Sequence, residues 1–112
     1  MLYLVLPTAP SHLLGKLHSA PELRDLMNEI AAEIPDKWKE VGIELGLATS
    51  DIKRIETDIP THKSNPCYVE VFHIWKTNDV EAYTWATVLK TLRTKLVNAH
   101  GLARTLESRL TK

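Results

Sequence analysis

Apolar residues recur at intervals of three and four in six successive blocks between residues 19 and 110. In the first block Leu23, Leu26, Met27, Ile30 and Ile34 share one side, because residues three, four and seven apart lie on the same face of a helix. Residues 68–75 are rich enough in β-branched residues to suggest a strand, but their 3, 4, 7 spacing favours a helix. The pattern therefore predicts an all-α protein of six helices.

Prolines, glycines and capping residues mark where the first three helices begin and end. Ser19 with Glu22 fits a capping box, and Pro35 ends the first helix. Asp36 is predicted to cap a second helix. This helix is predicted to end at Gly46, because glycine adopts a left-handed conformation at a low conformational cost. Thr49 or Ser50 is predicted to cap a third helix that ends before Pro60.

The last three helices are delimited in the same way. Asn65 followed by Pro66 predicts the start of the fourth helix, since proline is tolerated in the first turn. Thr84 is predicted to cap a fifth helix that reaches Leu96, and a sixth follows a break at 98–101. Six helices joined by short loops predict an antiparallel bundle. Its expected core includes the indoles of Trp38 and Trp75 and, on the later helices, Tyr68, Val71, Phe72, Trp85, Val88, Leu89, Leu92, Leu96, Ala103 and Leu106.

Residues 1–18 are predicted to be a leader or the remnant of a linker, and residues 19–112 the folded domain. The leader begins with an apolar run, residues 1–6 (MLYLVL), and later carries Leu13, Leu14 and Leu17. The run lacks the basic start of a secretory signal, and no stretch approaches the ~18 apolar residues of a membrane span. Membrane insertion is therefore not expected.

Composition excludes several classes of function. The 112 residues suffice for one domain, and 14 basic residues balance 14 acidic ones, whereas a general nucleic-acid binder needs a basic surplus. The lone Cys67 allows no internal disulfide, which fits a reducing, cytoplasmic location. Cys67 and His73 would lie about 120° from alignment on a helix, so a nucleophile–base pair is not expected. The five histidines are scattered without ligand spacing, which argues against a metal site.

Three segments resemble the death-domain family. Residues 38–47 (WKEVGIELGL) are similar to its tryptophan-led second helix, and residues 50–56 (SDIKRIE) to its third. Residues 71–75 (VFHIW), followed by Thr84, Trp85, Val88, Leu89 and Leu92, resemble its fourth and fifth helices. The resemblance covers about residues 22–110 and depends on the order and spacing of the three segments together.

This resemblance implies a six-helix Greek-key bundle that associates with other death-fold domains in apoptotic, inflammatory or receptor signalling. It implies neither an enzyme nor a cofactor nor a small-molecule substrate. In the family, the second and third helices supply one binding face, and the first and fourth supply its complement. The candidate partner-binding residues are Lys37, Lys39, Glu40, Glu44, Asp51, Lys53, Arg54 and Asp58, to which the basic C-terminal stretch adds Arg93 and Arg104.

Charge is unevenly distributed along this neutral chain. Residues 19–34 hold four acidic residues against one arginine, and residues 36–58 hold six acidic against four basic residues. Residues 90–112 hold six basic residues against one glutamate. The asymmetry suggests a head-to-tail contact between acidic and basic helices, although solvated helix faces would also explain it.

Two other functions remain open on the sequence. A regulatory domain could pack against its own parent chain, with residues 1–6 as part of that contact, since an exposed apolar run favours aggregation. A small helical DNA-binding domain is supported only by the basic stretch 90–112.

Overall fold

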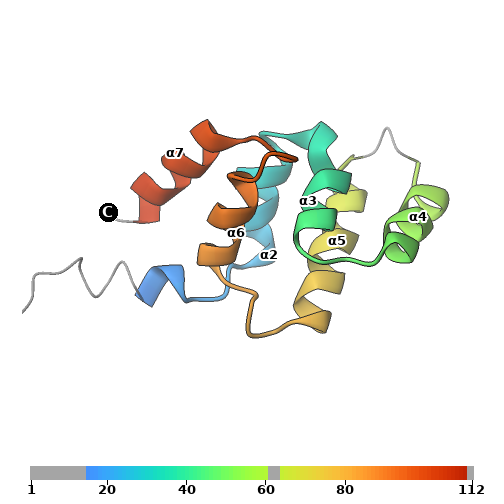
Figure 1. The fold of residues 1–112 in the computed structure, drawn as a ribbon, viewed down its shortest axis with the longest axis horizontal. Coiled ribbons are helices and arrows are strands. Elements are labelled where there is room, and N and C mark those ends of the chain that lie inside the picture. Colours follow the sequence, from blue (N-terminus) through green and yellow to red (C-terminus); the bar gives the residue numbers. More distant parts are fainter. Residues whose placement is uncertain (1–14, 61–63, 111–112) are drawn as a thin grey trace, which may run out of the picture.

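The computed structural model describes residues 15–60 and 64–110, and all regular structure within them is helical (Figure 1). The prediction of an all-α protein is therefore confirmed. The described elements are α2 (Leu23–Leu26), which continues into the π-helical η1 (Met27–Ala31), then the 3-10 helix η2 (Pro35–Lys37), α3 (Trp38–Glu44), α4 (Thr49–Asp58), α5 (Ser64–Asn78), α6 (Trp85–Leu92) and α7 (His100–Leu110). Residues 15–17 add one helical turn before α2.

Two predicted helix caps, Ser19 and Asp36, are wrong for different local reasons. The Ser19 hydroxyl donates to the carbonyl of Lys16 at 2.6 Å instead of capping the first helix. That helix begins at Leu23, and its N-cap Glu22 makes no side-chain capping bond. Asp36 lies inside η2, so it does not cap α3. The cap at Thr84 is confirmed, because its side chain accepts the amide of Thr87 at 3.3 Å.

The predicted fifth helix ends earlier than expected. α6 stops at Leu92, whose carbonyl accepts the amide of Ala99 at 2.7 Å, and this bond turns the chain back. Asn98 completes the turn in the left-handed region with φ 52°. The prediction that Leu96 belongs to the core is therefore wrong, since Leu96 is 41% exposed and Val97 is buried in its place.

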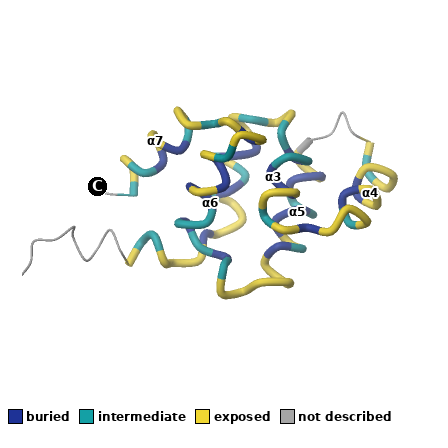
Figure 2. Tube along the Cα trace, viewed as in Figure 1, coloured by how far each residue is buried: buried dark blue, intermediate teal, exposed yellow. Residues whose placement is uncertain are grey.

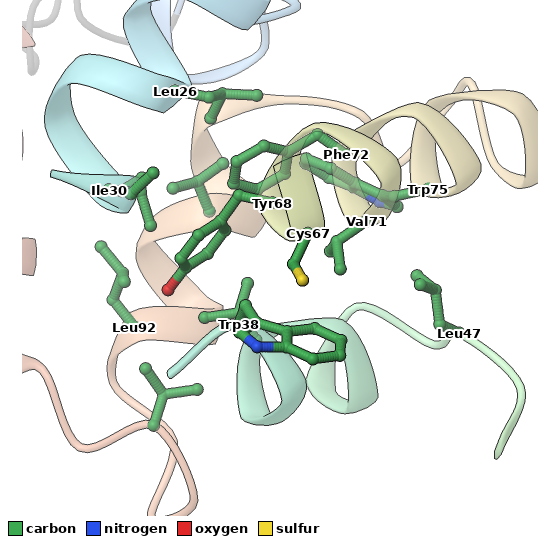
Figure 3. Close-up of a cluster of buried hydrophobic side chains, with 14 of the residues drawn as sticks. Leu26, Ile30, Trp38, Leu47, Cys67, Tyr68, Val71, Phe72, Trp75 and Leu92 are labelled. Atoms are coloured by element: carbon green, nitrogen blue, oxygen red, sulfur yellow. The ribbon is translucent and has the colours of Figure 1, made fainter. Parts of the chain in front are cut away.

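The core forms around α5, which carries Cys67, Tyr68, Val71, Phe72 and Trp75 on its buried face (Figure 3). The ring centroids of Tyr68 and Phe72 are 5.5 Å apart, which extends the apolar contact along the helix. Both predicted core indoles are buried, with Trp38 4% and Trp75 1% exposed. These side chains explain why the period of three and four identified the correct helical faces.

The helices around α5 differ in which neighbours they pack against. α3 and η1 pack directly on α5, whereas α4 packs on α3 and α5, and α7 packs chiefly on α6. As a result α4 and α7 lie at opposite ends of the molecule (Figure 1). Both end helices present exposed residues along much of their length (Figure 2).

Candidate protein-interaction surfaces

All ten predicted partner-binding residues reach the surface. Glu44, Lys53, Arg54, Asp58, Arg93 and Arg104 are exposed, and Lys37, Lys39, Glu40 and Asp51 are half-buried. The structure divides them between two groups of helices. Seven lie on α3 and α4, Lys37 lies just before α3, and Arg93 and Arg104 lie on the α6–α7 side.

We call the charged residues of α3 and α4, between positions 38 and 58, the acidic surface. Five acidic residues there oppose three basic ones, a net charge of −2. Lys39 pairs with Glu56 across the two helices, and Arg54 lies 4.0 Å from Asp51 on α4 itself. Within residues 15–60 and 64–110, Glu44, Lys53 and Asp58 have no ion-pair partner. The acidic surface thus retains side chains that a partner can engage.

We call the charged residues between positions 90 and 110 the basic surface. Lys90, Arg93, Lys95, Arg104 and Arg109 oppose Glu107 alone, a net charge of +4. Arg93 donates to Glu107 at 2.8 Å and so connects α6 to α7. Arg104, in contrast, is exposed and has no ion-pair partner in the part of the chain that the structure describes. Arg104 is therefore, like the exposed Lys90 and Lys95, a charge of this surface that no ion pair engages within the described residues.

One acidic residue of the segment 19–34 is paired within the molecule. Arg109 on α7 pairs with Glu29 on η1, eighty residues earlier in the chain. Part of the negative charge of residues 19–34 is therefore balanced within the molecule. No sequence signal indicates this pairing, because only the fold brings the two helices together.

Cys67 and His73, the residues considered as a nucleophile and a base, lie in different environments on α5. The Cys67 thiol is fully buried, and its sulfur points toward the Trp38 indole in Figure 3. Burial raises the pKa of this thiol, and the charge of Glu56 raises it further, so the thiolate is disfavoured. His73 is exposed on the same helix. Over the described ranges, no three His, Cys, Asp or Glu side chains gather as a metal site.

The larger hollows on the surface are open grooves. One of about 370 Å³ lies between the turn before α2, α6 and α7, and its charged lining includes the paired Glu29 and Arg109. Another of about 530 Å³ lies on α6, with Leu17, Ala86 and Leu89 in its wall. The sequence analysis did not identify this second groove. Of the leucines in the predicted leader, Leu17 lines this groove.

No protein-family model, no curated protein and no solved structure matches the chain. Among the helices that the structure describes, none has both the length and the apolar character to cross a membrane.

Proposed function

We propose that this chain is a death-domain-like interaction module that binds other domains of the same fold, including further copies of itself. The sequence segments that resemble the family fall on α3, α4, α5 and α6, in the family's order. Trp38 and Trp75, which lead and end two of these segments, both lie in the core. These placements support a six-helix Greek-key bundle built from α2–η1, α3, α4, α5, α6 and α7.

One observation carries the proposal. The acidic surface includes α4 and the basic surface includes α7, and these helices lie at opposite ends of the molecule (Figure 1). Two different patches of opposite charge favour a head-to-tail contact, which leaves one patch free on each partner and can propagate. Complementary potentials of this kind mainly set association rate and specificity.

Charge reversal with complementation tests the contact. Arg104→Glu removes an unpaired charge from the basic surface, and Glu44→Lys removes one from the acidic surface. Each variant alone should sediment with weaker self-association than the native chain at low salt. An equimolar mixture should regain a heterodimer, because each variant retains the surface that the other has lost.

Two controls separate binding from folding. Glu81→Lys reverses an exposed charge in the connection between α5 and α6, outside both surfaces; because this loop residue is only a weaker candidate for partner binding, the change should weaken self-association less than either surface variant. All three variants should melt within about 0.5 kcal/mol of the native chain, as surface substitutions usually do. A strict monomer at high concentration and low salt would refute self-association.

The alternative DNA-binding function loses support from the same geometry. Arg93 and Arg109, two of the basic residues that would contact phosphates, are engaged by Glu107 and Glu29. The alternative of packing against a parent chain depended on residues 1–6, which lie outside the described residues. Salt-dependent affinity for duplex DNA would restore the first alternative.

A further inference from the structure

Helix α7 makes a narrower contact with the bundle than the central helix α5 does. α7 buries Ala103 and Leu106, while Leu102 and Leu110 are half-buried and pack against the core. Its main packing neighbour is α6, whereas α5 packs on η1, α3 and α4. Apolar burial therefore ties α7 to the bundle chiefly along one side.

Open grooves border α7. One of about 370 Å³ is lined by Leu106 and Leu110 of α7 together with Trp85 of α6. Another of about 410 Å³ lies between α7 and the segment from η1 onward, with Leu102 and Ile34 in its wall. Solvent therefore reaches apolar side chains of α7 in two separate grooves, whereas a closely packed core would exclude it.

Two ion pairs in the walls of these grooves connect α7 to its neighbours. Arg109 pairs with Glu29 of η1, and both residues line the 370 Å³ and the 410 Å³ groove. Glu107 accepts a hydrogen bond from Arg93 at 2.8 Å, and this pair lines the 530 Å³ groove on α6. All four side chains remain partly exposed, so salt can screen both attractions.

We infer that α7 opens and closes as one unit while the rest of the bundle stays folded, and that the two ion pairs set how often it opens. Segments with little apolar burial open locally at a lower free energy than global unfolding requires. Because the ion pairs of Arg93 and Arg109 are electrostatic ties, opening becomes more frequent as ionic strength rises. The inference depends on contacts within one chain and not on the proposed self-association.

Opening of α7 would divide the basic surface. Arg104 and Arg109 lie on α7, whereas Arg93 directly follows α6. When α7 leaves α6, these charges no longer act together on one partner. A partner carboxylate that engages Arg109 also competes with Glu29 and so weakens one tie of the helix. Binding at the basic surface and opening of α7 are therefore coupled.

Amide hydrogen exchange of the full chain tests the opening, followed by NMR under native conditions at low protein concentration. The amides of Ala103 and Leu106 should exchange at least about tenfold faster than those of Val71 and Phe72 on α5, and with a weaker dependence on urea. Raising NaCl from about 0.01 M to about 1 M shortens the Debye length from about 30 Å to about 3 Å. This change should speed exchange in α7 by roughly threefold to tenfold relative to α5, since two exposed pairs are screened.

A neutral variant outside α7 identifies the tie. Glu29→Gln removes the pair with Arg109 without changing the helix itself, and it should speed exchange in α7 by up to about fivefold, the upper range for an exposed pair. Glu33→Gln is the matched control, because it removes an exposed carboxylate of the same segment that has no ion-pair partner within the described residues. Lys39→Gln breaks the pair with Glu56 between α3 and α4. Both controls should leave exchange in α7 unchanged relative to α5.

Two results would overturn the inference. Exchange of Ala103 and Leu106 with the rate and urea dependence of Val71 and Phe72 would show that α7 opens only with the whole bundle. Faster exchange in α7 that neither salt nor Glu29→Gln alters would show that the ion pairs do not control the opening.

Discussion

The Tyr68 hydroxyl joins α5 to the end of the first helix, and its removal gives the sharpest test of how the bundle is held. The side chain is 0% exposed, and its hydroxyl donates to the carbonyl of Ile34 at 2.5 Å. Tyr68→Phe deletes this oxygen alone, because a phenyl ring can retain the contact with Phe72. The substitution therefore isolates one hydrogen bond.

The expected loss of stability depends on whether the Ile34 carbonyl keeps another hydrogen-bond donor after Tyr68→Phe. The Lys37 amide also donates to this oxygen, at 3.1 Å, so the variant does not leave it without a partner. The cost should therefore be that of one hydrogen bond, about 1 kcal/mol, and not the larger penalty of a buried orphan group. Tm should fall by roughly 3–6 °C, measured by circular dichroism at pH 7.

The pH dependence of this difference adds a second signature. Burial raises the pKa of Tyr68 above its ordinary value of 10.0, and the charges of Glu40 and Asp36 raise it further. Below pH 10 both the folded and the unfolded chain hold the proton, so the stabilisation is fully present. Above pH 10 the unfolded chain releases it first, and stability falls as pH rises. The advantage of the native chain over Tyr68→Phe should therefore be constant from pH 7 to 9 and shrink above pH 10 (values set by the ordinary tyrosine pKa of about 10).

Tyr83→Phe is the matched control. Tyr83 is also buried, which raises its pKa, and its ring lies 4.6 Å from that of Trp75. Its hydroxyl has no hydrogen-bond partner in residues 15–60 and 64–110, so the control should cost less at pH 7 than Tyr68→Phe. Equal stability of native protein and Tyr68→Phe at pH 7, with parallel curves to pH 11, would refute the reasoning.

Four further substitutions probe the packing and the turns. Gly42→Ala should destabilise the protein slightly, by about 1 kcal/mol in urea unfolding, because the new Cβ would lie 2.8 Å from the Ile52 Cδ1 atom and the end of that buried side chain must shift. Gly101→Ala, where a Cβ meets no atom within 4 Å, should instead stabilise α7 by up to about 1 kcal/mol; equal effects would contradict both. Trp38→Ala should cost roughly 3–5 kcal/mol as a buried aromatic, and a loss under 1 kcal/mol would show that the core is misassigned. Gly46→Ala should cost about 1 kcal/mol because φ is +93° there, and an unchanged midpoint would argue against that turn.

The sequence predicted the helical faces well because burial acts on every turn. Tyr68, Val71, Phe72 and Trp75 lie on one stripe in the pattern and in the core alike. A full turn of apolar side chains outweighs the β-branched content of α5, which on its own favours a strand.

Helix ends were harder to predict because they depend on single hydrogen bonds. Ser19 has the chemistry of an N-cap, yet its hydroxyl bonds backwards to Lys16. In η1 the Ala32 amide reaches back five residues to the Met27 carbonyl, at 3.1 Å. This wider turn buries Ile30 and Ala31 in succession, and no periodicity of three and four anticipates it.

The sequence predicts which segments carry the charges of the candidate surfaces, but not where these charges lie in the folded protein. Counting charges along the chain identified acidic and basic segments. It could not show that Glu29 and Arg109 meet, because that contact depends on how α7 lies over η1. The separation of α4 from α7 is likewise a property of the bundle and not of any local pattern (Figure 1).

In the proposed head-to-tail contact, the same separation would let the charges that bind a partner vary without loss of folding stability. α4 and α7 each pack on a few neighbours and leave much of their surface to solvent. Exposed ion pairs such as Arg93–Glu107 contribute at most about 1 kcal/mol, so charges at the two ends can change while the bundle stays folded. Core side chains such as Trp38 and Tyr68, in contrast, cannot be changed without a loss of stability. A head-to-tail adaptor needs this division, since its specificity resides in charges that folding does not fix.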